Sequence, residues 1–184
     1  MESLKKYLYK IADAKHLLIC GIIFIIFNIF IFPYLQNRID PTGQHPMLDL
    51  LFGYSLNEAY YILDAIGREG RSAHLFATSA ADMFYPVVYA LLLSIIIALM
   101  MKKLMFTDGI LSYIIFFPFL IMAFDFIENS AIIVMVSSFP HLPEGAVLLG
   151  SYAGMAKWVS TGIVILIILI SGIMILKRKI FKLK

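Results

Sequence analysis

Four long apolar stretches dominate this sequence, and they restrict its possible folds more than any other feature. They cover about residues 16–35, 78–101, 109–137 and 151–176. A helix needs roughly 20 predominantly apolar residues to cross a bilayer core of about 30 Å, and each stretch meets that requirement. We therefore expect an all-α integral membrane protein whose spans form a four-transmembrane-helix bundle.

The composition agrees with this class. Hydrophobic residues make up 61% of the chain, charged residues only 15%, and the mean hydropathy is +0.91, which excludes an ordinary soluble domain. We expect residues 1–184 to form a single membrane domain. The net charge of +3 comes from basic flanks that suit anionic lipid, so nucleic-acid binding is not expected.

Lysine and arginine gather beside particular ends of the spans. Lysines precede the first span, Lys102 and Lys103 follow the second, and the tail after the fourth is basic. Such residues accumulate on the cytoplasmic side of short loops. We therefore predict that both termini are cytoplasmic, that segments 36–77 and 138–150 face outward, and that the protein resides in the cell membrane.

The first span and the single cysteine exclude two alternatives. No small-residue cleavage pattern follows the first span, so we expect a retained helix rather than a signal peptide. Cys20 is the single cysteine, so an internal disulfide and a dithiol redox pair are excluded.

The four-span layout resembles that of vitamin K epoxide reductase-like proteins, but this chain lacks their cysteine pairs. The presence of acidic residues in a small helical bundle also resembles sterol isomerase and sigma-2 receptor-type proteins, at the level of the fold alone.

The loop after the first span has its own helical signal. Ser55 followed by Glu58 is a capping-box pattern, and Gly67 is placed as a terminator. We expect an amphipathic extracytoplasmic helix over residues 56–66. Its predicted apolar face consists of Leu56, Ala59, Tyr60, Leu63 and Ile66. This helix would rest on the outer surface, cap the bundle, or cover a site as a lid.

Four ionisable residues interrupt the apolar stretches: Asp82, Asp125, Glu128 and Lys157. Charged groups in hydrocarbon are costly, so they normally face a bundle interior and pair with one another or with a ligand. These residues are the strongest indication of a functional site.

Polar residues on the second span recur at helical spacing. Arg71, His74, Thr78, Asp82, Tyr85 and Tyr89 are separated by three, four, four, three and four residues, which predicts one helical stripe. Pro86 cannot donate a hydrogen bond to the carbonyl of Asp82. Pro33 and Pro118 should likewise release the carbonyls of Ile29 and Ile114, and the resulting kinks can open a cavity.

The third and fourth spans complete the predicted site. Asp125, Glu128 and Asn129 share one helical face, and two carboxylates so close in a low dielectric do not both ionise unless a cation neutralises them. Lys157 is the candidate cation, unless it snorkels to the outer surface. The predicted ligand-binding set is Asn28, His74, Thr78, Asp82, Tyr85, Tyr89, Asp125, Glu128, Asn129, Lys157 and Trp158.

Several functions fit such a site. The leading hypothesis is a site near the outer face that binds a small molecule, a lipid or a cation. The alternatives are an enzyme acting on a lipid-like substrate, with Asp82, Asp125 and Glu128 as candidate acids and bases, a transporter, or an accessory subunit with a purely structural network. No HExxH motif or close histidine pair occurs, so we expect no metal and no cofactor. Membrane lipid, a homo-oligomer or a membrane protein partner are the expected associations.

Overall fold

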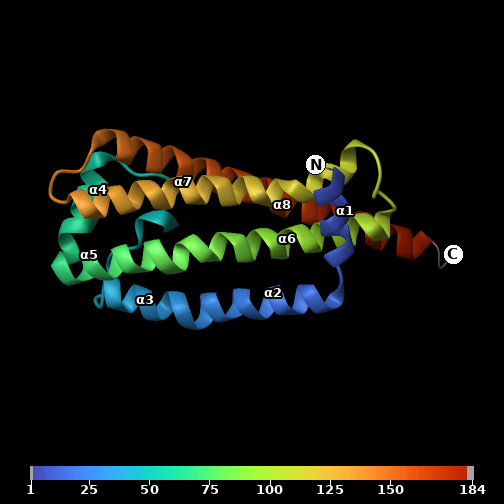
Figure 1. Ribbon diagram of the computed structural model, residues 1–184, viewed down its shortest axis with the longest axis horizontal. Helices are drawn as coiled ribbons and strands as arrows, with labels where there is room; N and C mark the ends of the chain where they lie inside the picture. Colours follow the sequence, from blue (N-terminus) through green and yellow to red (C-terminus); the bar gives the residue numbers. More distant parts are fainter. Residues whose placement is uncertain (1, 182–184) are drawn as a thin grey trace.

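Four long helical segments run side by side along the molecule (Figure 1). The computed structural model describes residues 2–181. The segments are Ala14–Ile39, Gly67–Leu104, Ile110–Ser138 and Glu144–Ile180, each long and apolar enough to cross a membrane. No strand occurs in the described part of the chain. The prediction of an all-α, four-helix membrane bundle is confirmed.

Most segments are composed of several helices. The first contains α2 (Ala14–Ile26), a π-helical turn Phe27–Ile31 and α3 (Phe32–Ile39). The second contains α5 (Gly67–Phe76), a π-helical turn Ala77–Ala81 and α6 (Asp82–Leu104). The third joins a 3₁₀ helix Ile110–Phe116 to α7 (Phe117–Ser138), and the fourth is α8 (Glu144–Phe181).

The helices extend beyond the predicted spans. The second segment is 38 residues long, or about 57 Å at about 1.5 Å per residue, far more than a bilayer core requires. Hydropathy marks only the apolar part of a helix, and the hydrogen-bonded backbone continues into polar residues at either end. The polar helix α5 is such an extension.

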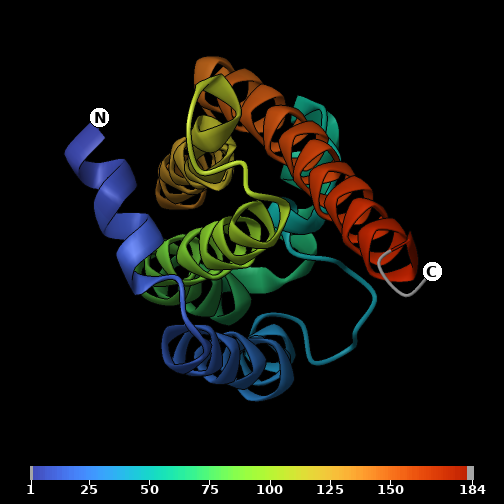
Figure 2. The ribbon, with the colours of Figure 1, turned by 90° about the vertical axis from the view of Figure 1, so that its right-hand side faces the viewer.

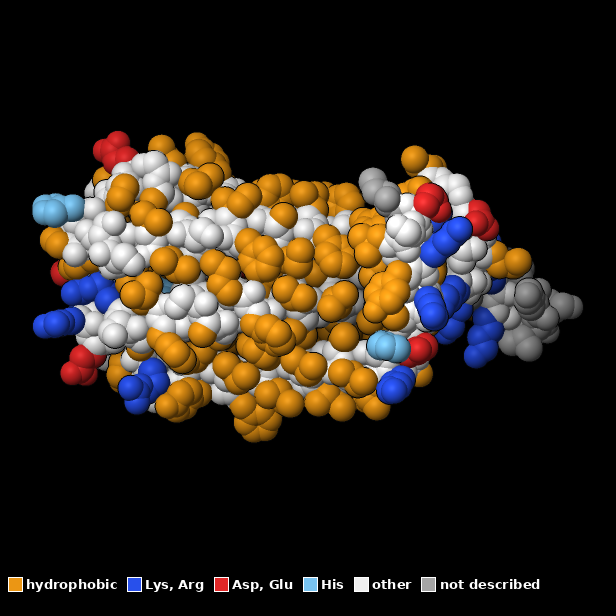
Figure 3. All heavy atoms as spheres, in the orientation of Figure 1, with side chains coloured by type: hydrophobic (Ala, Val, Ile, Leu, Met, Phe, Trp, Pro, Cys, Tyr) orange, Lys and Arg blue, Asp and Glu red, His pale blue; other side chains and the backbone are white. Residues whose placement is uncertain are grey.

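The surface of the bundle is divided into three zones. On the face shown in Figure 3, a belt of hydrophobic side chains covers the middle, and charged side chains gather at the two ends. Exposed apolar residues such as Phe30, Ile165 and Leu169 contribute to the belt. A soluble protein seldom exposes so large an apolar surface, and lipid is the solvent that suits it.

Helix α6 is the central element of the bundle. It packs against α2, α7 and α8, whereas α2 packs mainly against α6 (Figure 2). The first segment is therefore the most peripheral span, and only 6% of its most apolar window is buried.

The described chain begins and ends at one end of the bundle (Figure 1). There α1 (Glu2–Ile11) lies across the helix ends, with Leu8 only 3% exposed. The Lys5 ammonium donates a hydrogen bond to Ser112 Oγ at 3.3 Å. The location of this end in the cytoplasm remains a prediction from the charge distribution.

The opposite end carries α4 (Leu56–Ala65), whose capping box forms as predicted. Ser55 Oγ accepts a hydrogen bond from the Glu58 backbone N–H, and the Glu58 carboxylate accepts one from the Ser55 backbone N–H at 2.8 Å. Gly67 has a φ of 66°, a conformation that glycine adopts without strain.

The predicted apolar face of α4 is partly wrong. Ala59 and Leu63 are fully buried and Ile62 is 8% exposed, whereas Leu56 is 37% and Tyr60 42% exposed. The buried face packs on Ile132, Met135 and Val147 at the ends of α7 and α8. The helix therefore caps the bundle, with its buried face rotated toward Ile62 because the tertiary contact lies on that side.

Candidate functional site

Three of the four predicted intramembrane charges, Asp125, Glu128 and Lys157, meet at the contact between α7 and α8. The Lys157 ammonium lies 2.5 Å from Glu128 Oε2 and 3.5 Å from Asp125 Oδ1. Glu128 is fully buried, and the other two residues are each 7% exposed. Lys157 therefore does not snorkel to the surface; it points into the bundle.

The spacing of α7 and α8 explains this contact. Asp125, Glu128 and Asn129 share the face of α7 that packs on α8, and all three are buried. Gly154 of α8 lies directly opposite Glu128, and a methyl group at that position would overlap with Glu128 Oε1. Because Gly154 has no side chain, the Glu128 carboxylate fits between the two helices.

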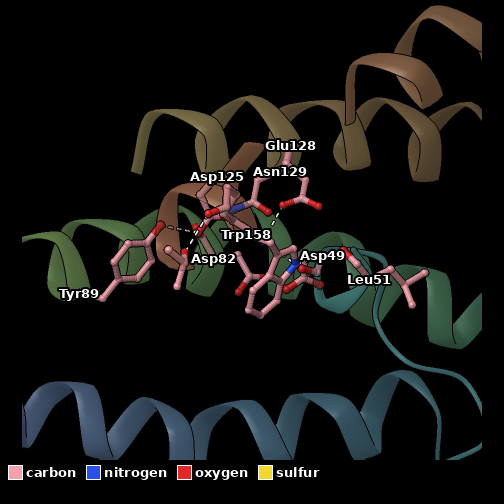
Figure 4. A network of polar contacts seen from close by, with 10 residues as sticks. Asp49, Leu51, Asp82, Tyr89, Asp125, Glu128, Asn129 and Trp158 are labelled. Carbon is pink, nitrogen blue, oxygen red and sulfur yellow. Dashed lines mark hydrogen bonds and ion pairs between the residues drawn. The ribbon is translucent and has the colours of Figure 1, made fainter. Parts of the chain in front are cut away.

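The polar stripe of the second span is only partly directed toward these charges. His74, Thr78, Asp82 and Tyr89 are buried, and Tyr89 donates a hydrogen bond to Asp125 Oδ2 at 2.9 Å (Figure 4). His74 Nδ1 lies 3.1 Å from Thr78 Oγ1.

Three predicted polar residues point elsewhere. Arg71 donates to the Leu63 carbonyl and lies over the Phe139 ring. Tyr85 faces the first span, where it accepts a hydrogen bond from Asn28 Nδ2 at 2.9 Å. The structure therefore places Asn28 outside the cluster. The π-helical turn Ala77–Ala81 interrupts α-helical spacing, so one straight stripe does not continue along the whole segment.

The effects of two prolines differ. As expected from Pro86, the Asp82 carbonyl is available, and it accepts a hydrogen bond from Asn129 Nδ2 at 2.9 Å. The expectation for Pro118 is wrong, because the Ile114 carbonyl accepts a bond from the Phe117 N–H. The 3₁₀ helix that precedes α7 satisfies this carbonyl through an i to i+3 bond.

The loop between the first two spans contributes residues to the site beyond those predicted from the sequence. Met47 and Leu48 are buried, and a short 3₁₀ helix Leu48–Leu50 brings Asp49 against α8. The Lys157 ammonium donates to the Asp49 carbonyl at 2.9 Å. Trp158 Nε1 donates to the Leu51 carbonyl at 3.1 Å. Part of this loop therefore enters the bundle, whereas the outward orientation of segment 36–77 stays a prediction from the charge distribution.

A second loop residue, Tyr54, is held against the same face of α8. Its backbone N–H donates to Ser151 Oγ at 2.9 Å, and a methyl group on Gly150 would overlap with its hydroxyl. Burial, followed by the charges of Glu128 and Asp49, raises the pKa of Tyr54. The Gly150–Gly154 spacing is the small-residue pattern of close helix contacts, and it is the sequence signal that marks this face.

The cluster contains more hydrogen-bond acceptors than donors. Asp49, Asp82, Asp125 and Glu128 supply carboxylates, against the single ammonium of Lys157. Several buried polar atoms have no hydrogen-bond partner within the described chain: Asp49 Oδ1, Asp82 Oδ2, Glu128 Oε1, Asn129 Oδ1, His74 Nε2 and Tyr54 Oη. Unpaired buried polar atoms are rare because each costs about 1–3 kcal/mol.

The arrangement is suited to accepting hydrogen bonds from a positively charged donor. Within residues 2–181, no three His, Cys, Asp or Glu side chains converge closely enough to hold a metal ion. The unpaired acceptors are distributed over α6, α7 and the Leu48–Leu50 helix. The chain matches no family model, no curated protein and no solved structure in comparisons with known proteins.

Proposed function

We propose that this multi-pass membrane protein binds a small organic cation, such as a protonated amine, in the cluster of Asp49, Asp82, Asp125 and Glu128. The proposal depends on one observation: buried acceptor oxygens from three elements have no donor within the described chain. An ammonium group supplies both the missing donors and positive charge.

The contacts of Lys157 support this choice of ligand. Its ammonium is already shared between Glu128, Asp125 and the Asp49 carbonyl. It therefore has little capacity left for the Asp82 carboxylate, whose Oδ2 atom is unpaired. A second cation beside Asp82 compensates the remaining negative charge, which is costly in a low-dielectric interior.

The surroundings favour an organic cation with an apolar part. Trp158 lies beside the cluster, is 38% exposed and contributes an indole face, and aromatic faces attract ammonium groups. The bundle end that carries α4 lies nearest to the cluster. The charge distribution predicts that this end is extracytoplasmic, so the ligand would enter from outside.

A thermal-shift experiment on detergent-purified protein tests this function. Primary amines should raise the melting temperature in a concentration-dependent manner. At a ligand concentration of 100 times Kd, the free energy of unfolding should rise by about 2.7 kcal/mol. Alcohols with the same carbon skeletons should not. Asp82→Asn and Asp49→Asn should reduce the response, and Asp108→Asn, on the exposed connection before the third span, should retain it. Equal responses to amines and alcohols would contradict the proposal.

A purely structural role for the network is the second candidate, because the Lys157 ammonium on α8 contacts both α7 and the inserted loop. In that case no ligand response is expected from any variant, and a fully apolar replacement of the network should still fold. The change in the free energy of unfolding on Lys157→Met measures this structural contribution separately.

A further inference from the structure

A groove runs between the first span and the second, and its lining residues are not those of the acid cluster. It consists of two adjoining hollows of about 530 and 550 Å³. Tyr34, Leu35 and Phe76 line both hollows, so they form one continuous surface. The groove follows the line of contact in which α2 packs on α6 and α3 packs on α5.

The two halves of the groove differ in chemistry. The first hollow carries Arg38, Glu69 and Ser72, at the bundle end where α3 and α5 lie side by side (Figure 1). The second hollow is deeper in the apolar belt and is almost entirely hydrophobic. Its other lining residues are Phe27, Phe30, Ile31, Ala80, Ala81 and Phe84. A charged end followed by an apolar channel matches a membrane lipid, with headgroup and acyl chain in that order.

The helices that border the charged end of the groove are tightly packed. A methyl group on Gly70 would overlap with the Ile39 carbonyl, so α5 approaches the end of α3 at backbone distance. Beneath the groove, Leu35 is 7% exposed and Ala77 is fully buried, in one cluster with Ile39 and Met47. The groove therefore has a packed floor rather than a loose gap.

The charges at the polar end restrict the headgroup. Arg38 and Glu69 are exposed, and among residues 2–181 neither forms an ion pair within 4.0 Å. A guanidinium binds phosphate through paired hydrogen bonds. A carboxylate repels phosphate but accepts hydrogen bonds from a primary ammonium. Both groups are satisfied together by a headgroup that carries a phosphate and a primary amine.

We propose that the groove is a specific site for a phospholipid with an ethanolamine headgroup. Arg38 binds the lipid phosphate, Glu69 binds the terminal ammonium, and one acyl chain lies between the Phe27–Phe30 region and Ala80. A choline headgroup fits less well because its quaternary nitrogen has no hydrogen to donate. A glycerol headgroup has no positive charge to compensate the Glu69 carboxylate.

The test compares three phospholipids that have identical acyl chains and carry ethanolamine, choline or glycerol headgroups. Each is titrated into the full chain in detergent, and lipid retention is measured by native mass spectrometry. We expect the ethanolamine lipid to be retained about three- to tenfold more strongly than the choline lipid, the range of one partly exposed charge-assisted hydrogen bond.

Variants separate the contributions to binding. Arg38→Gln should weaken all three lipids, and Glu69→Gln should remove the preference for ethanolamine over choline. Ala80→Trp should block the acyl-chain channel and weaken all lipids without changing any charge. Arg68→Gln and Asp64→Asn serve as matched controls, because both residues are exposed near this end but do not line the groove.

Three outcomes would overturn the proposal. Equal retention of the three lipids by the parent indicates non-specific annular lipid. A preference for the glycerol lipid indicates a simple basic patch. Loss of binding in the control variants to the same extent as in Arg38→Gln indicates that charge in general is responsible. The results for Arg38→Gln and Glu69→Gln are independent of the amine proposal, because neither residue belongs to the acid cluster.

Discussion

At the scale of single residues, Lys157 supplies the positive charge that the buried acidic residues require. Its ammonium neutralises Glu128 and Asp125 across the α7–α8 contact. Removing one partner of a buried pair leaves an uncompensated charge, which destabilises a protein far more than the intact pair stabilises it.

We predict that Lys157→Met lowers the free energy of unfolding by about 3 kcal/mol. Adding Asp125→Asn and Glu128→Gln should recover much of this loss, because neutral side chains no longer need the ammonium. Denaturant titration in mixed micelles measures both changes. If the single and triple variants were equally unstable, the steric role of Lys157 rather than its charge would be responsible.

The glycines of α8 give a second prediction at this scale. Gly154→Ala should destabilise the bundle by about 1–3 kcal/mol, because the new methyl group overlaps with Glu128. Gly162→Ala is the matched control: no atom lies within 4 Å of the added carbon, and alanine favours the helix by up to about 1 kcal/mol. Thermal unfolding should therefore shift in opposite directions for the two variants, and a downward shift in both would contradict the steric argument.

At the scale of elements, α4 and the loop before it act as one cap on the bundle. Hydrogen bonds from the Ser55 backbone N–H and hydroxyl lower the pKa of Glu58 from its ordinary value of 4.5. A carboxylate with a lowered folded-state pKa stabilises the fold fully above its unfolded pKa, and this contribution is lost as the pH falls through the folded value.

We therefore predict that the amide hydrogens of α4 exchange faster, relative to the rest of the bundle, as the pH falls below 4.5. Glu58→Gln should remove this pH dependence. Asp64→Asn, which changes an exposed carboxylate of the same helix outside the cap, should preserve it. Hydrogen–deuterium exchange corrected for the intrinsic pH effect provides the measurement; identical profiles for the parent and Glu58→Gln would contradict the predicted capping effect.

At the scale of the whole molecule, the basic ends of the helices predict the orientation in the membrane. In a Cys20→Ser background, Glu144→Cys should react with a membrane-impermeant maleimide added to intact cells, whereas Asp108→Cys should react only after the cells are opened. The reverse pattern would place the termini outside and would move the proposed amine site to the cytoplasmic half.

The sequence by itself determined the four spans, the cap of α4, the grouping of Asp125, Glu128 and Asn129, and the availability of the Asp82 carbonyl. These features follow from hydropathy and from contacts within a few residues, which helical periodicity predicts. Only the tertiary structure decided that the Asp49 loop enters the bundle, that Tyr85 turns to Asn28, and that a groove opens beside the first span. Those features depend on packing between segments that are distant in the sequence. Gly70, Gly150 and Gly154 allow this packing because they have no side chains. Hydropathy contains no information about such complementary shapes.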